Sequence, residues 1–513
     1  MKKLMNVALL LLLSFGAVSC DLNKYPSNAL PEAEGFLNYD DATEFRRGFY
    51  SLTRSCFSSS SVIPVNTQAE GINPTLNFGN SLSNQYFWNF SDNDQYVSAI
   101  WSNCYVSIFQ INYFLSKANN LLEEDSKLEE FDENKMTPEQ VENINLFIAE
   151  AHLFRALLNR QLVTFYCNDY DPSTADEELG IIITKDVDVT ARHSRSSLAK
   201  TYEAINEDIN YAQPVIEAYY NSHSINANYI SPDVVKALKA KVLLDTHQYQ
   251  EAATLCEDIV KAYPLIRNAN EFAAMWASDT GSEIIFQFYA SVSEGGTSNG
   301  SYFLNDPYQT QQSYQPYYIP SQWILDQYDS RDVRKTTYFG QKPCRIGTEN
   351  YMLYLVTKYP GNPAYNATAG RNSLLHNVRL YRSADFQLMA AECYANLNDL
   401  ANANNALKQL MEARMIMGSD YQFEPYNSIS EITSAIRNER LKELYMETNR
   451  IEDLKRWNMP MSRLAQNPQN EEVVVQIDMY LDIPANDYRF VWPIPQAETS
   501  QNKNIQNQQN RGW

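Results

Sequence analysis

The sequence is poor in basic residues. It carries 41 Lys and Arg against 62 Asp and Glu, which gives a formal net charge of −21 at pH 7. Proteins that bind nucleic acids neutralise phosphates with a surplus of Lys and Arg, so this composition argues against a nucleic-acid partner. The same deficit argues against attachment to an anionic lipid surface by basic attraction.

Long apolar runs and metal-binding spacings are also missing. After the first twenty residues no stretch approaches the roughly 18 apolar residues that a membrane-spanning helix needs. The five histidines show no H-x-x-x-H spacing and no two cysteines form C-x-x-C, so we expect no zinc site and no cofactor. Asp92-Asn93-Asp94 lacks the glycine and distal glutamate of a calcium loop. A calcium ion held by backbone carbonyls would leave no trace in the sequence.

The N-terminus predicts export. Lys2 and Lys3 precede a short apolar core at residues 9–13, and small residues at 16–19 lead into Cys20. This is the layout of a secretory signal peptide, and the small residues before the cysteine resemble a bacterial lipobox. We therefore expect residues 1–19 to be removed, Cys20 to be lipidated and residues 20–40 to form a leader. Plain secretion is the alternative.

Six further cysteines follow Cys20. Three of them, Cys104, Cys256 and Cys393, fall on apolar faces of expected helices. Buried free cysteines behave as small hydrophobic residues, which is the simpler interpretation. Export also permits disulfides, so the sequence leaves their redox state open.

Apolar residues recur at helical spacing over much of the chain. One run extends from Trp101 to Leu122 and a second from Ile144 to Leu162, each with apolar residues three and four apart. A third helix is expected from Ser197 to about Tyr220, with Ser196 or Ser197 as its N-cap. These patterns predict a mainly α fold.

Two segments share a repeat. Ala240 and Ala252 lie twelve residues apart in the first, and Ala391 and Ala403 lie twelve apart in the second. Small residues at these points let two antiparallel helices approach closely, a pattern that resembles the tetratricopeptide repeat. We expect such helices at about 100–266 and 380–457, stacked into a right-handed scaffold.

Two stretches break the helical pattern, at about 60–98 and 267–379. The second contains Ile284–Phe288, which has the composition of a strand, followed by Ser/Gly and aromatic, proline-broken segments. We interpret both as loop and short-strand excursions from one domain at 41–513. Loops carried on a rigid frame are where binding sites usually lie.

Two patterns resemble catalytic motifs, but their sequence context does not support a catalytic role. Residues 296–300 match G-x-S-x-G, but a Ser/Gly loop precedes them and a poor helix follows, so Ser298 lacks the strand–turn–helix setting of a hydrolase nucleophile. The acidic and basic residues from Arg437 to Arg456 fall at i, i+3 and i+4 spacings, which predicts ion-pair ladders along a helix. We expect no catalytic residue.

Several segments, in order along the chain, resemble the SusD/RagB family of nutrient-uptake lipoproteins of the Bacteroidetes outer membrane. Besides the signal ending in Cys20, they are Ala149-Glu150-Ala151 through Arg155-Ala156 to Val163, Leu380-Tyr381-Arg382 through Asp385 to Glu392, Glu439-Arg440 through Arg450 to Trp457, and Trp492-Pro493-Ile494-Pro495 with the C-terminal Asn510-Arg511-Gly512-Trp513. Residues 319–323 and 332–335 look closer to the RagB branch.

The resemblance implies a function. Such proteins cap a SusC/RagA-like TonB-dependent transporter at the cell surface and hold an oligosaccharide or oligopeptide for uptake without covalent chemistry. The resemblance therefore also implies that a lipid anchor in the outer membrane holds this chain at the cell surface. A helical-repeat adaptor or adhesin without a small ligand is the main alternative, and a surface hydrolase is a weaker one.

The chain is rich in aromatics, with 35 Tyr, 22 Phe and seven Trp, many of them beside Asn, Asp and Gln. Aromatic faces stack on sugar rings or peptide side chains, while amides and carboxylates bond hydroxyls or backbone groups. For any one aromatic, core packing or a transporter contact is the alternative. The ligand-binding residues that we predict are Asn84, Tyr86, Trp88, Asp92, Asp94, Tyr302, Tyr308, Tyr314, Tyr317 and Tyr318.

Overall fold

The computed structural model describes residues 36–513 except 189, 226–227, 292, 294–295, 308–311, 369, 419, 448, 464–465 and 477–480. The expected signal peptide, Cys20 and Tyr308 therefore lie outside the described residues. None of the helices in the described part of the chain is long and apolar enough to cross a membrane.

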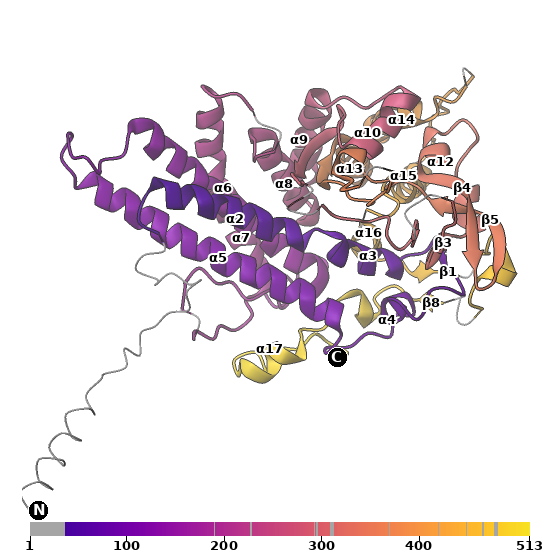
Figure 1. Cartoon of the computed structure of the whole chain (residues 1–513), viewed down its shortest axis with the longest axis horizontal. Coiled ribbons are helices and arrows are strands. Elements are labelled where there is room, and N and C mark those ends of the chain that lie inside the picture. The colour runs from indigo at the N-terminus through magenta and orange to yellow at the C-terminus, as the bar shows by residue number, and fades with distance from the viewer. Residues whose placement is uncertain are drawn as a thin grey trace, which may run out of the picture.

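Long helices form one half of the molecule and run side by side in Figure 1. The expected mainly α fold is confirmed, as is the helix that begins after Ser197, whose side chain accepts a hydrogen bond from the Lys200 backbone N–H. The helices of this half are α2 (Tyr39–Cys56), α3 (Ser59–Gln68), α5 (Gln95–Ser126), α6 (Pro138–Tyr166), α7 (Leu198–Tyr220), α8 (Pro232–Asp245) and α9 (Tyr249–Ala262), while the short α4 (Ser83–Tyr86) lies with the strands of the other half.

The expected repeats are two helix pairs. The first pairs α8 with α9, and the second pairs α13 (Ser383–Asn396) with α14 (Leu400–Arg414). Ala240, Ala252, Ala391 and Ala403 are all fully buried, as expected for small residues at close helix contacts. Helix α9 packs on α13, so residues 120 or more apart in the chain form one continuous helical stack.

Short strands and helices form the other half, and two antiparallel pairs organise it. Strand β1 pairs with β3 through Ile72 and Pro320, which joins the two excursions. Strand β2, at the expected position, pairs with β6. The elements of this half are β1 (Ile72–Pro74), α10 (Ala269–Ser278), β2 (Ile284–Phe288), β3 (Tyr318–Pro320), α11 (Gln322–Asp326), α12 (Val333–Tyr338), β4 (Phe339–Ile346), β5 (Glu349–Val356), η2 (Pro363–Tyr365) and β6 (Val378–Arg382).

The C-terminal part of the chain returns across both halves. Trp492 packs its ring against Phe165 of α6 at 5.1 Å and donates a hydrogen bond from its indole to the Gln68 side chain at 3.2 Å. The C-terminal elements are α15 (Ile429–Glu443), α16 (Asn449–Arg456), β7 (Met461–Ser462), η3 (Glu471–Val473), β8 (Asp482–Ile483), η4 (Tyr488–Phe490) and α17 (Gln496–Gln501).

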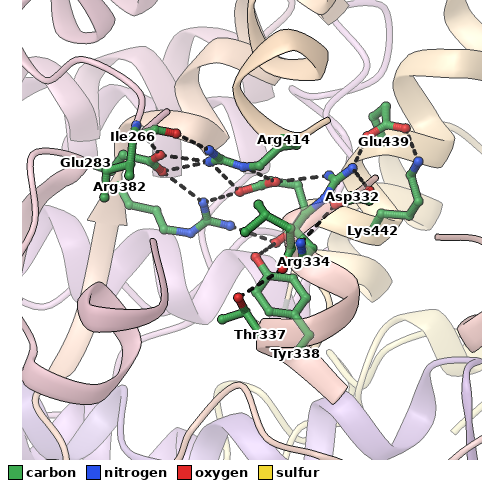
Figure 2. Close-up of polar contacts among 12 residues, drawn as sticks. Ile266, Glu283, Asp332, Arg334, Thr337, Tyr338, Arg382, Arg414, Glu439 and Lys442 are labelled. Atoms are coloured by element: carbon green, nitrogen blue, oxygen red, sulfur yellow. Dashed lines mark hydrogen bonds and ion pairs between the residues drawn. The ribbon is translucent and has the colours of Figure 1, made fainter. Parts of the chain in front are cut away.

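A buried ionic cluster around Glu443, the last residue of α15, joins the second excursion to the second repeat pair. Its carboxylate lies 3.0 Å from Arg334 of α12, 2.6 Å from Arg382 of β6 and 2.9 Å from Arg414 of α14, and all four side chains are nearly inaccessible to solvent. Figure 2 shows the three arginines reaching this point from different elements. Glu283, just before β2, contacts Arg414 at 2.9 Å and closes the cluster on that side.

The Glu443 cluster corrects the expected ion-pair ladder. Among the described residues of 437–456, Glu439–Lys442 and Asp453–Arg456 pair at i, i+3 spacing, whereas Arg440 and Arg456 also reach Asp385 and Glu392 of α13. Burial by itself would raise the pKa of the Glu443 carboxyl, but Arg414, Arg382 and Arg334 together hold that pKa well below its usual range. The charges are therefore tertiary contacts and not a solvated helix face.

Removing the central carboxylate should destabilise the fold strongly. Glu443→Gln leaves three buried arginines short of one negative charge, and breaking a buried pair in this way costs about 3–5 kcal/mol of unfolding free energy. Urea unfolding at neutral pH would measure the loss. Glu124→Gln is the matched control, because Glu124 pairs with Lys127 on the surface, where such pairs contribute little.

The same variant should show a pH dependence. Since the folded-state pKa of Glu443 lies below that of the unfolded chain, its stabilisation is complete above the unfolded pKa and is lost as the pH falls. The gap between wild type and Glu443→Gln should therefore narrow in acid. Equal stability of the two proteins at neutral pH would contradict the central role of this carboxylate.

Candidate functional site

The β1–β3 pair brings the two predicted ligand loops together. The segment from Thr75 to Asp94 leaves β1, and the segment from Tyr302 to Tyr317 leads into β3. Two hydrogen bonds extend the pairing, from the Thr75 backbone N–H to the Tyr317 carbonyl at 2.9 Å and from the Tyr318 hydroxyl to the Ser81 carbonyl at 2.6 Å. The two excursions, which lie far apart in the sequence, therefore meet along this pair.

Four of the predicted aromatics are core residues. Tyr86 and Tyr318 are fully buried, Trp88 is 1% exposed and Tyr314 is 5% exposed. The Trp88 indole donates to the Gln68 carbonyl at 2.9 Å, and its ring packs edge-on against Phe490 at 5.0 Å. No ring face of these side chains is open for stacking on a ligand, so the structure corrects their expected exposure and assigns them to packing.

The predicted acids also serve the fold. Asp94 is the N-cap of α5 and accepts hydrogen bonds from the backbone N–H groups of Tyr96 and Val97 and from the Gln85 amide. Asn84 is exposed and donates to the same carboxylate at 3.2 Å. Asp92 is half-buried, and its carbonyl accepts from the Gln496 N–H. Asp94 is therefore a structural cap, while Asn84 keeps an exposed side chain.

Half-buried aromatics form the open part of the region, which we call the aromatic patch: Phe87, Tyr96, Tyr302 and Tyr317. Their side chains are neither core nor fully exposed. The rings of Tyr302 and Tyr317 lie 5.5 Å apart, inclined at 54°. Burial, with a hydrogen bond to Tyr96, raises the pKa of Tyr302 to about 12, so its hydroxyl stays protonated at physiological pH.

The sequence analysis missed Tyr96 and did not select Phe87. Tyr96 is the second residue of α5, and the cap at Asp94 fixes where that helix starts. A side chain in the first helical turn lies beside the loop that precedes the N-cap, and this position could have identified Tyr96 from the sequence. Phe87 was named within the loop, and its ring packs edge-on against Tyr86 at 5.0 Å.

A polar hollow borders the same segment. Its volume is about 270 Å³, and residues on either side of Tyr302 contribute to it. Tyr314 forms part of its wall, and burial followed by the nearby Asp306 raises the pKa of that tyrosine. Its polar lining residues are Ser298, Ser301, Asn305, Asp306, Lys342, Thr357, Asn372 and Ser373.

Ser298 has no nucleophile setting here. Its carbonyl accepts from the Ser301 N–H in a turn, and Thr297 pairs with His376 in an isolated bridge. The His376 ring accepts from the Asn299 backbone N–H at 3.3 Å and does not contact Ser298 through any hydrogen bond in the described residues. The G-x-S-x-G segment therefore lacks the strand and helix of the hydrolase elbow.

The described part of the chain contains no cluster of metal-binding side chains and no disulfide. No group of three or more His, Cys, Asp or Glu side chains gathers there to hold a metal ion. The six cysteines after Cys20 are free and buried in this structure.

Two family models match the sequence. The first, described as the SusD family, matches residues 339–513. The second, described as "Starch-binding associating with outer membrane", matches residues 51–242. Together they cover more than half of the chain and include all but one of the segments that carry the resemblance. Neither match separates a RagB branch, so that expectation stays a prediction. Among proteins of curated function, none matches this chain.

Solved structures share the fold over nearly the whole chain. A SusD superfamily protein from Bacteroides thetaiotaomicron VPI-5482 has 22% identity and a TM-score of 0.73, covering 92% of this chain and 100% of that one. A putative sugar binding protein from Bacteroides vulgatus ATCC 8482 has 20% identity and a TM-score of 0.70, with coverage of 93% and 99%. A SusD-like carbohydrate binding protein from the same strain has 18% identity and a TM-score of 0.72, with coverage of 91% and 97%.

The position of Trp88 leads to a stability prediction. Trp88→Ala should remove a filled core volume and an indole hydrogen bond, at a cost of about 3–5 kcal/mol of unfolding free energy. Thermal unfolding would measure it. Leu76→Ala is a control on the same loop, since Leu76 is 58% exposed and should change little. An unchanged melting temperature for Trp88→Ala would show that the ring is not packed as described.

Proposed function

The chain belongs to the SusD family, and we propose that it is a carbohydrate-binding protein of the outer membrane that captures an oligosaccharide at its aromatic patch. Support comes from the match of residues 51–242 to a family described as starch-binding and associated with the outer membrane, and from the shared fold of a putative sugar binding protein and a carbohydrate binding protein. The position of the patch, where the two excursions meet, is the observation that carries the proposal.

The chemistry of the patch suits a sugar. A pyranose ring presents a face of C–H groups that packs on an aromatic ring, and its hydroxyls need donors and acceptors at the rim. Tyr302 and Tyr317 supply inclined rings, and the Tyr302 hydroxyl remains a protonated donor. The polar hollow beside them offers Ser, Asn and Asp side chains to neighbouring sugar units of a longer chain.

An oligopeptide is the competing cargo. Aromatic rings can pack on peptide side chains, and the amides of the hollow can bond a peptide backbone. The similar structures of sugar-binding and carbohydrate-binding proteins favour an oligosaccharide over an oligopeptide. Peptides are therefore the competing ligand in the binding experiment. We further propose that the chain caps a SusC/RagA-like TonB-dependent transporter, which rests on the family resemblance alone.

Ligand capture should depend on the patch. The double variant Tyr302→Ala with Tyr317→Ala removes both inclined rings and should weaken binding of the preferred oligosaccharide roughly tenfold to a hundredfold, since stacked aromatic contacts contribute on the order of 1–3 kcal/mol. Calorimetry with the purified mature chain against an oligosaccharide library and a peptide digest would measure it. Both tyrosines are half-buried, so circular dichroism should confirm an intact fold.

Tyr211→Ala is the matched control, because Tyr211 is 45% exposed on α7, far along the helical half from the patch. It should bind as wild type does. Equal affinity of the double variant and wild type would exclude the patch as the binding site, and binding of peptides in place of sugars would overturn the proposed ligand class.

We propose that Cys20 carries the lipid anchor. Cys20→Ala should release the protein from the membrane fraction, because acylation supplies the apolar area that holds an exported chain at a bilayer. Cell fractionation would test this in a strain that lacks the partner transporter, with Cys56→Ala as the control variant. Membrane association of Cys20→Ala in that strain would contradict lipidation.

A further inference from the structure

A second hollow lies on the C-terminal part of the chain and shares no lining residue with the aromatic patch. Its volume is about 690 Å³, and it is bounded by the end of α6, the end of α16 and the segment around η4. In Figure 1 the C-terminus lies near α4 and α17, at the lower edge of the molecule. None of the predicted site residues lines this hollow, so the proposed function leaves it without a role.

Tyr488 gives the hollow an aromatic wall. Its side chain is 43% exposed. One side of its ring lies on Gly512, so closely that a Cβ on that glycine would come within 2.4 Å of the ring. Trp513 packs edge-on against it at 4.9 Å and 73°. Arg489 lies over the ring as well, with its guanidinium carbon 5.8 Å from the ring centroid, so the exposed part of the side chain is what Gly512, Trp513 and Arg489 leave open.

The backbone around Tyr488 is fixed before any ligand arrives. The Asp487 side chain accepts from the Arg489 backbone N–H at 3.0 Å and pairs with the Arg489 guanidinium at 2.8 Å. The Trp513 indole donates to the Val491 carbonyl at 2.8 Å. Because these contacts hold the ring in place, little conformational entropy would be lost on stacking.

Polar side chains line the same hollow as the ring. Asn458, Asn486 and Arg511 line the hollow, are exposed and make no side-chain hydrogen bond or ion pair within the described residues. Asn458 and Asn486 both adopt left-handed backbone conformations, with φ of 50° and 61°. They thus occupy sharp turns whose positions are fixed by the elements that precede them.

The charges of the hollow favour a neutral ligand. Its acids are Asp169, Glu178 and Asp487, and its cations are Lys455 and Arg511. Lys455 is not available, because its ammonium donates to the Thr164 and Cys167 carbonyls at the end of α6, at 2.6 and 2.8 Å. Because Asp487 pairs with Arg489, the lining charges left to meet an anion are the carboxylates of Asp169 and Glu178 and the guanidinium of Arg511, which favours a neutral ligand.

We infer that this hollow is a second binding site for a neutral sugar residue, stacked on Tyr488 and bonded by the amides of Asn458 and Asn486. An exposed, fixed ring face with amides at its rim is the arrangement that recognises a polyhydroxylated ring. This inference rests on the proposed function for its ligand class, but it uses none of the residues of the aromatic patch. The second site would let one protein hold a long glycan at two points.

The test uses the full mature chain labelled with 5-fluorotryptophan. The ¹⁹F resonance of Trp513, assigned with Trp513→Phe, reports on the hollow because its ring contacts Tyr488. The probes are the methyl glycosides of glucose, galactose, mannose, xylose and N-acetylglucosamine, with triglycine as the peptide arm. At least one glycoside should shift the Trp513 resonance in a saturable way.

The variants separate the two sites. Tyr488→Ala should weaken the apparent affinity at Trp513 roughly tenfold, as expected for loss of a stacked ring, while Tyr488→Phe should keep it. Asn486→Gly tolerates the left-handed backbone, so it removes only the amide and should weaken binding without unfolding the turn. The double variant of Tyr302 and Tyr317 should leave the Trp513 shift unchanged.

Each contrary outcome has a distinct meaning. If calorimetry shows sugar binding that depends on Tyr302 and Tyr317 while Trp513 never shifts, the second site is excluded and the proposed function stands. A Trp513 shift that survives Tyr488→Ala, or that only triglycine produces, also overturns the inference. Absence of sugar binding by both readouts would overturn the inference and the proposed function together.

Discussion

The contact of Glu443 with Arg334, Arg382 and Arg414 is the constraint on which the rest of the structure depends. One carboxylate receives guanidinium groups from three elements, and the set is buried where water cannot replace a missing partner. The four residues lie on α12, β6, α14 and α15, so the cluster fixes the second excursion to the helical stack. An incomplete set would leave unpaired charge in the core, so the elements that supply it must assemble together.

Buried cations also hold the first excursion in place. The Arg463 guanidinium donates to the carbonyls of Thr67, Gln68, Ala69 and Tyr86, and it stacks on the Tyr86 ring at 3.8 Å. The chain before β1 and the loop after it are therefore tied to the C-terminal segment. With both excursions fixed, the half-buried rings between them form a surface of set shape, which lowers the entropy lost when a ligand binds.

The aromatic residues divide into two groups that composition could not distinguish. Tyr86, Trp88, Tyr314 and Tyr318 face inward and pack the loops, whereas Tyr302 and Tyr317 remain half-buried at the surface. Trp88, one of the predicted ligand-binding residues, is buried and does not present its ring to a ligand. In an aperiodic loop no spacing rule says which side chain faces the core, whereas a helix has a period that does.

The sequence by itself determined α5, α6 and α7 and the two repeat pairs with their buried alanines, whereas α3 and α10 lie inside the stretches where it predicted loops and short strands. These features follow from local rules of spacing, residue size and capping, which act within a few turns of chain. Only the tertiary structure decided the partners of the charged residues and the orientation of the loop aromatics. Arg334 and Glu443 meet across 109 positions, and Tyr96 joins Tyr302 from another element, because these contacts depend on how distant elements pack and not on any local pattern.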